Sequence, residues 1–247
     1  MPPSPVLTSF FSRHGRLRPV RLKSASGGHR RYTAPKLFEM PCGAKDFSLF
    51  EMKVRRDAAS AQTNMAVKTD ANGNVIFNAT GTGHATFMKD AALENGEKLS
   101  IGWDVTMGTV QALDGTKIQA SKNGPMEVSI TKLDGTVVKG GSEMLPEGFN
   151  NKTDCHGSTF AGGQVWINND QVGKLLSHSG FKQTDSSAAG NVGVYTVGGS
   201  VVHSVTSVGS GNVYSKGGIT PGGVVSAGPG PGTGWIDPRA TLTWYTR

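Results

Sequence analysis

Alternating apolar and polar positions recur in short runs from about residue 61 onwards. This alternation is typical of half-buried β-strands, and the Asp-Gly and Asn-Gly pairs between runs are typical of hairpin turns. The pattern therefore predicts a β-rich module over residues 61–145, in which 82–88 pairs with 74–80. Its expected strands are 74–80, 82–88, 98–105, 110–113, 117–119, 126–131 and 136–138.

The pattern changes after residue 145, where a loop over 143–155 leads into a second region. A short helix is expected over 171–176, after the helix-capping residues Asn168, Asn169 and Asp170 and before Gly180. Glycine and proline dominate residues 217–234, which predicts a loop. The strands expected in this region are 191–197, 200–208, 213–216 and 240–245. The fold class is therefore α+β, with a β-rich N-terminal module followed by a domain over 146–247 that contains a small antiparallel sheet.

Positive charge is concentrated at the N-terminus. Residues 1–38 hold eight of the 25 Lys and Arg residues and no acidic residue, although the net charge of the whole chain is only +7. The remaining residues are nearly neutral, so we expect a disordered basic leader over 1–60 and no specific nucleic-acid-binding face on the domains. A leader that binds nucleic acid through its charge alone is the weaker alternative.

The chain shows no apolar run of the roughly 20 residues that span a bilayer, and no signal-peptide core. We therefore expect no transmembrane segment. The compartment stays open, because a secreted or periplasmic location would need an export route without a recognisable signal peptide. The oligomeric state is equally open.

Two residues carry the candidate chemistry. Cys155 lies among small polar residues in Asp154-Cys155-His156-Gly157, and His203 follows 48 positions later in an alternating apolar segment. A thiol needs a base to form a thiolate near neutral pH, and a histidine on a neighbouring element is the usual base. This order predicts Cys155 as nucleophile and His203 as base. A buried structural cysteine and a core histidine are the alternative interpretation.

A third polar group usually orients a catalytic imidazole. Ser215 on the following strand is our candidate, with Asn212 and Asp237 behind it. A zinc site made of Cys155, His156 and His203 would lack the paired spacing of zinc ligands, so no metal is expected. A disulfide between Cys42 and Cys155 is the remaining, weaker alternative for the two cysteines.

Three segments together resemble the NlpC-like and CHAP-like branch of the papain-like cysteine peptidases and amidases. They are DCHGSTF around Cys155, GNVGVY at 190–195 and GGSVVHSVTSV at 198–208, and NVYSKGG at 212–218 follows as the next strand. In that branch the nucleophilic cysteine opens a helix and the base histidine lies on a strand. Here no helix after Cys155 is evident, because Gly162-Gly163 interrupts the segment.

The resemblance implies cysteine-dependent amide hydrolysis without a cofactor, with peptides or peptidoglycan peptides as substrates. Cys155, His203 and Ser215 would be catalytic, and His156, Gly157 and Trp166 would line the substrate site. Backbone N–H groups of Cys155 and His156 would form an oxyanion hole if the chain is helical there. The alternative is a non-enzymatic β-rich binding or structural module, which the high content of glycine, threonine and asparagine also suits.

Overall fold

The computed structural model describes residues 65–93, 95–226, 237 and 239–247. The predicted leader over 1–60, and Cys42 within it, lie outside these residues. The described part combines two antiparallel sheets with short helices, in agreement with the α+β prediction. None of its helices is both long and apolar enough to cross a membrane.

The first sheet has five strands in the order β1-β2-β4-β5, with β3 also paired to β2. Asp114-Gly115 joins β2 to β3 and Asp134-Gly135 joins β4 to β5, so both predicted hairpins are confirmed. The 3-10 helix η2 (Ser142–Met144) follows the last strand. The strands are β1 (Asn78–Ala92), β2 (Lys98–Gln111), β3 (Lys117–Asn123), β4 (Glu127–Thr131) and β5 (Val137–Gly140).

The predicted pairing of 74–80 with 82–88 is wrong. The turn at Asn72-Gly73 exists, but it closes only a single bridge between Thr69 and Val75. Residues 78–92 then form one continuous strand that lies beside β2. Thr80-Gly81-Thr82-Gly83 contains glycines but no residue with positive φ, so the backbone there stays extended.

The second sheet has six strands in the order β10-β9-β8-β7-β11-β6. Gly198-Gly199, with φ of +57° and +81°, forms the tight turn between its strands β7 and β8, as predicted. Strand β10 lies inside the segment 217–234 that we expected to be a loop. The strands are β6 (Lys182–Thr184), β7 (Val192–Val197), β8 (Ser200–Gly209), β9 (Asn212–Ser215), β10 (Gly223–Ser226) and β11 (Thr241–Thr246).

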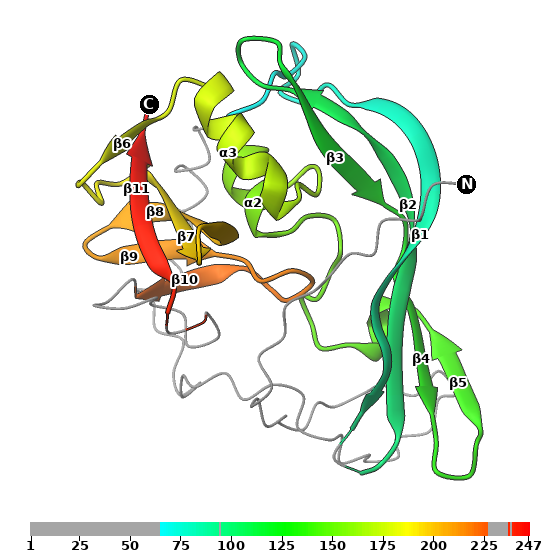
Figure 1. Cartoon of the computed structure of the whole chain (residues 1–247). Helices are drawn as coiled ribbons and strands as arrows, with labels where there is room; N and C mark the ends of the chain where they lie inside the picture. The colour runs from blue at the N-terminus through cyan, green and yellow to red at the C-terminus, as the bar shows by residue number, and fades with distance from the viewer. Residues whose placement is uncertain (1–64, 94, 227–236, 238) are drawn as a thin grey trace. The chain divides into compact units, whose positions relative to one another are not determined.

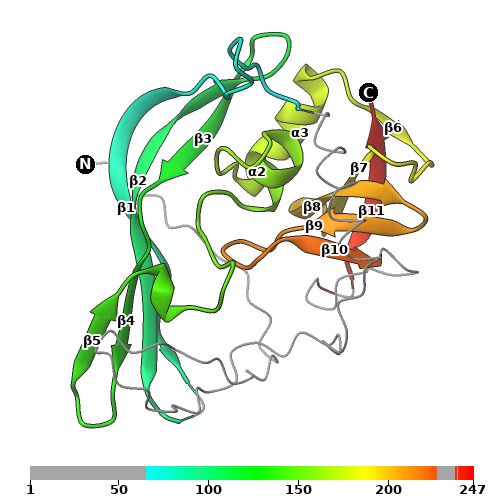
Figure 2. The ribbon, with the colours of Figure 1, turned by 180° about the vertical axis from the view of Figure 1, so that it is seen from behind.

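Two helices cover one face of this sheet, α2 (Cys155–Phe160) and α3 (Asn169–His178) (Figures 1 and 2). Helix α3 confirms and extends the predicted helix at 171–176. Val192 and Val194 of β7 pack with the helices in one core cluster. The residues that alternate with these valines face the other side, where Tyr195 packs with Val205 and Val213. The two faces of the sheet therefore bury different side chains.

The described chain divides into two compact units that do not follow the sequence order. One contains Thr82–Val105 and Gly124–Asn150, and the other contains the described residues before Thr82 together with Thr106–Asn123 and Asn151–Arg247. The long strands β1 and β2 thus contribute to both units. The helices, the second sheet and every candidate residue named above from Cys155 onwards belong to the second unit.

Candidate functional site

Cys155 is the first residue of α2, and the residue before it holds the helix start in place. The carboxylate of Asp154 accepts hydrogen bonds from the backbone N–H of Gly157 at 2.7 Å and of Ile167 at 3.2 Å. A side-chain acceptor at this position satisfies N–H groups that a helix start leaves unpaired. Helix α2 ends at Phe160, before Gly162 and Gly163, which both have positive φ. Asp154 is the signal for this helix that the sequence interpretation missed.

His156 lies inside the protein, with no exposed surface. Its Nε2 lies 2.8 Å from Oδ1 of Asn169, and its Nδ1 lies 2.8 Å from the hydroxyl of Ser204. The amide oxygen only accepts, so Nε2 carries the proton and Nδ1 accepts from Ser204. Burial lowers the pKa of His156 to about 4. This residue joins α2 and α3 to β8, and its placement gives no support to the predicted role in substrate binding.

Gly157 and Trp166 also have structural positions. A Cβ on Gly157 would collide with the carbonyl oxygen of Val165 and the hydroxyl of Thr153, so glycine is required by the packing of the protein itself. Trp166 is half-buried, and its backbone N–H and carbonyl are both hydrogen-bonded to Ser121, at 2.8 and 2.9 Å. Neither placement supports a substrate-binding role.

The structure brings His203 and Ser215 together as the sequence predicted. The hydroxyl of Ser215 on β9 lies 2.9 Å from Nε2 of His203 on β8, and both side chains are buried. The imidazole packs beside Tyr195, with 5.9 Å between ring centroids. Burial lowers the pKa of His203 well below its usual value, and the charge of His156 acts in the same direction. The ring is therefore neutral near neutral pH, which is the form that a base needs. Of the other two candidates for this role, Asp237 instead binds Arg239.

Cys155 is a free thiol that is only 8% exposed. Burial raises its pKa, the charge of Asp154 raises it further, and the backbone N–H groups of Ser204, His156 and Cys155 lower it. Its sulfur is thus close to the backbone of the residue that follows His203. Ser204 points toward α2, where its hydroxyl lies 2.8 Å from Nδ1 of His156, so the preceding residue, His203, points to the other face of the sheet, beside Tyr195. The structure therefore does not bring the thiol and the imidazole together on one face of the sheet.

A buried lysine also belongs to this region, and the sequence interpretation missed it. Lys216 follows Ser215 directly and is 5% exposed, and its Nζ donates to the carbonyl oxygens of Gly218 at 2.6 Å and Thr220 at 3.0 Å. Burial lowers the pKa of Lys216 to about 8, while the charges of Asp154 and Cys155 raise it. In turn, burial raises the pKa of Asp154 to about 7. A lysine at the end of a predicted strand usually faces solvent, so nothing in the sequence marks this one as buried.

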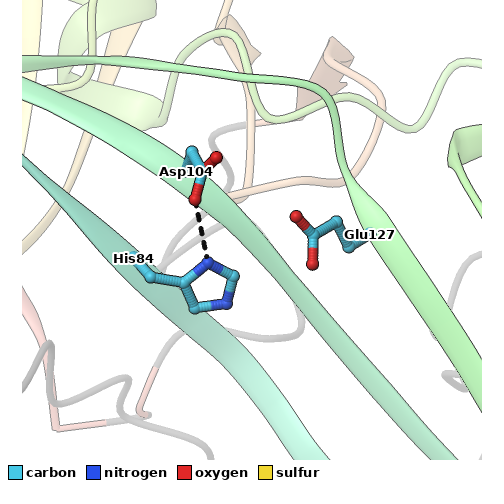
Figure 3. A group of neighbouring side chains, drawn as sticks. All are labelled: His84, Asp104 and Glu127. Carbon is cyan, nitrogen blue, oxygen red and sulfur yellow. Dashed lines mark hydrogen bonds and ion pairs between the residues drawn. The ribbon is translucent and has the colours of Figure 1, made fainter.

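A second group of titratable side chains lies on the first sheet, in the other unit. His84 on β1, Asp104 on β2 and Glu127 on β4 have ligand atoms within 4.8 Å of one another, and Nδ1 of His84 lies 3.2 Å from Oδ1 of Asp104 (Figure 3). Gly102 makes room for the imidazole, because a Cβ there would lie 2.8 Å from Nε2 of His84. All three side chains are exposed, and exposed groups of this kind are common without a metal ion, so this geometry alone does not make a metal site.

Comparison with protein families, with curated proteins and with solved structures yields no match for this chain. The resemblance to the NlpC-like and CHAP-like enzymes therefore stays a prediction.

Proposed function

We propose that the chain is a cysteine-dependent amide hydrolase in which Cys155 is the nucleophile and His203 the base. The observation that carries this proposal is the placement of the thiol at the start of α2, against the backbone of Ser204, which follows His203 in the chain, while Ser215 holds Nε2 of that imidazole. A nucleophile on α2, a base on β8 and an orienting group on β9 are the parts that acyl transfer requires.

The reaction would begin from a neutral thiol and a neutral imidazole, because burial opposes charge on both groups. The thiol and the imidazole lie on opposite faces of the sheet in this structure, so the two side chains would first have to come together. Nε2 of His203 faces Ser215, so Nδ1 would then take the thiol proton as sulfur attacks the carbonyl carbon. The backbone N–H groups of Cys155 and His156 would stabilise the resulting oxyanion. The imidazolium would then protonate the leaving amine as the C–N bond breaks. Water would hydrolyse the thioester, with His203 accepting its proton.

The substrate class follows from the resemblance rather than from the site. Peptides and the peptide part of peptidoglycan are the candidates, since both present amide bonds and need no cofactor for hydrolysis. Approach of a substrate to a thiol that is 8% exposed requires the surrounding segments to move.

The decisive experiment measures two quantities in the full chain with Cys42→Ser as background. They are the pKa of Cys155, from the pH dependence of iodoacetamide alkylation, and the release of amine from peptidoglycan peptides. Cys155→Ala is expected to abolish release, and His203→Ala is expected to reduce it by roughly a hundredfold or more. His178→Ala is the matched control, because His178 is a partly exposed histidine that binds Asp114 at 2.8 Å in the same unit.

A second function is favoured by specific observations, namely that of a non-enzymatic β-rich binding or structural module. The thiol is buried with a raised pKa, and the β4–β5 hairpin exposes the apolar residues Leu133, Val137 and Val138. Under this alternative Cys155 is a packing residue. A folded Cys155→Ala variant would then retain every property of the parent, and the parent would release no amine.

A further inference from the structure

The proposed mechanism does not use the buried pair of opposite charges, Asp154 and Lys216. Both side chains are 5% exposed, and each lies one residue from a member of the proposed site: Asp154 precedes Cys155, and Lys216 follows Ser215. Charged side chains are rarely buried to this degree unless they are paired. The pair therefore calls for an explanation in terms of the site.

Backbone register places Lys216 beside the start of α2. Strands β8 and β9 pair Ser207 with Val213 and Thr206 with Tyr214. If this antiparallel register is continued by two residues, Lys216 lies opposite Ser204, on the same face of the sheet. The hydroxyl of Ser204 bonds to His156 in the first turn of α2 at 2.8 Å. Ser204 thus links the turn that carries Cys155 to the strand position opposite Lys216.

The position of the ammonium group is fixed. Two backbone carbonyls, of Gly218 and Thr220, accept hydrogen bonds from Nζ at 2.6 and 3.0 Å. The carboxylate of Asp154 is fixed as well, through the N–H groups of Gly157 and Ile167. Both charges act on the environment of the same thiol: Asp154 disfavours a thiolate at Cys155, and Lys216 attracts one. In a poorly solvated site such interactions are only weakly screened.

We propose that Lys216 is a positioning residue that supplies the positive charge against which Cys155 ionises, and that it offsets the opposing charge of Asp154. This inference rests on the proposed function for its biological meaning, but its physical content is the reactivity of the thiol. It assigns to the charge pair the control of nucleophile strength, a role that His203 does not fill in the conformation described here.

The test is a double-mutant cycle on Asp154 and Lys216, read by the rate of iodoacetamide alkylation of Cys155 at one pH between the pKa of Asp154, about 7, and that of Lys216, about 8, where both groups are mostly charged. The full chain carries Cys42→Ser so that one thiol reacts. Lys216→Met is expected to slow alkylation roughly tenfold, and Asp154→Asn to accelerate it roughly tenfold, because a change of one pKa unit alters the thiolate fraction by that factor. The double variant should react at close to the parent rate. Asp154→Asn keeps the oxygen that caps α2.

Two further variants separate charge from packing. Lys216→Arg keeps a positive charge and should retain most of the parent alkylation rate. If the role of Lys216 were purely structural, the charge of the arginine would not restore that rate. Lys174→Met removes an exposed lysine from α3 and should leave the rate unchanged.

A folded Lys216→Met variant that reacts as fast as the parent would overturn the inference. If Lys216→Met does not fold, Lys216→Gln takes its place, because its amide can still donate to a backbone carbonyl while the charge is lost. An unchanged rate in that variant equally overturns the inference. The proposed function can fail separately. The alkylation rates could change as expected in a protein that releases no amine from peptides. That result would support the role of Lys216 and Asp154 in thiol reactivity and would contradict the proposed hydrolase activity.

Discussion

The hydroxyl of Ser215 lies 2.9 Å from Nε2 of His203, and this hydrogen bond joins two neighbouring strands inside the protein. His203 is 1% exposed and Ser215 is 7% exposed, so water does not compete effectively for either group. The serine hydroxyl can accept from a protonated Nε2 or donate to an unprotonated one, and in the first case the acceptor lone pair of the ring is on Nδ1. The bond therefore holds the orientation of the ring and contributes to the stability of this region.

Ser215→Ala is expected to destabilise the protein by about 1–3 kcal/mol, because it removes the hydrogen bond that Ser215 makes with the buried Nε2 of His203. The measurement is urea unfolding at neutral pH. Ser177→Ala is the control, since its hydroxyl donates to the carbonyl of Gly173 on the exposed side of α3. That change should cost less than about 0.5 kcal/mol. Equal effects of the two substitutions would mean that the buried His203–Ser215 bond contributes no more to stability than the exposed bond of Ser177.

Gly157 is expected to tolerate no side chain. In Gly157→Ala the new Cβ would meet the carbonyl oxygen of Val165 and the hydroxyl of Thr153, neither of which is a flexible chain end. Overpacking of this kind costs about 1–3 kcal/mol or more. Thermal unfolding of the variant should show a markedly lower midpoint.

The matched control for this prediction is Gly173→Ala in α3, where a Cβ would meet no atom within 4 Å. Alanine is the better helix former, so this variant should be more stable than the parent by roughly 0.5–1 kcal/mol. A lower midpoint for Gly173→Ala would show that the environment of α3 differs from the one described.

The free energy of unfolding should fall as the pH is lowered from about 6.5 to 4.5. Burial lowers the pKa of His156 to about 4 and that of His203 well below its usual value, so in this window the unfolded chain binds two protons that the folded chain does not. Asp154 acts in the opposite direction, because its folded pKa of about 7 lets the folded chain bind one proton that the unfolded chain does not. The net loss is about 1 kcal/mol per pH unit.

Asp154→Asn removes the opposing proton and should make this decrease roughly twice as steep. Urea unfolding at several pH values gives both slopes. Stability that stays constant or rises as the pH falls would contradict the buried neutral state of the two histidines.

The sequence predicts the second region well where local chemistry determines the structure. Alternation across Val192, Val194 and Val205 marks strands, Gly198-Gly199 forms the turn, and a serine one strand beyond His203 does bind it. Each of these features depends on the pleat of a strand or on the next strand in order.

What the sequence does not predict depends on contacts between distant segments. Asp154 is a residue type common both in loops and at helix starts, and its bonds to Gly157 and Ile167 show that here a helix begins after it. The burial of Lys216 requires carbonyls of a later loop, and the burial of His156 requires Asn169 and Ser204. In the first sheet, two predicted strands merge into β1 because β2 provides one long partner. Tertiary pairing overrides the local pattern in that strand.

Tyr195→Phe is expected to leave stability unchanged or to raise it by up to about 1–2 kcal/mol. The Tyr195 side chain is fully buried beside His203, and its hydroxyl has no hydrogen-bond partner among the described residues. A buried hydroxyl without a partner loses its hydration and gains nothing in return, so phenylalanine suits the same space without that cost. Urea unfolding measures the difference in the free energy of unfolding between the variant and the parent. Tyr245→Phe is the control, because it makes the same chemical change at a half-buried position on β11. A loss of more than about 1 kcal/mol in Tyr195→Phe alone would mean that the hydroxyl does bind a partner, such as a water molecule next to the His203 imidazole.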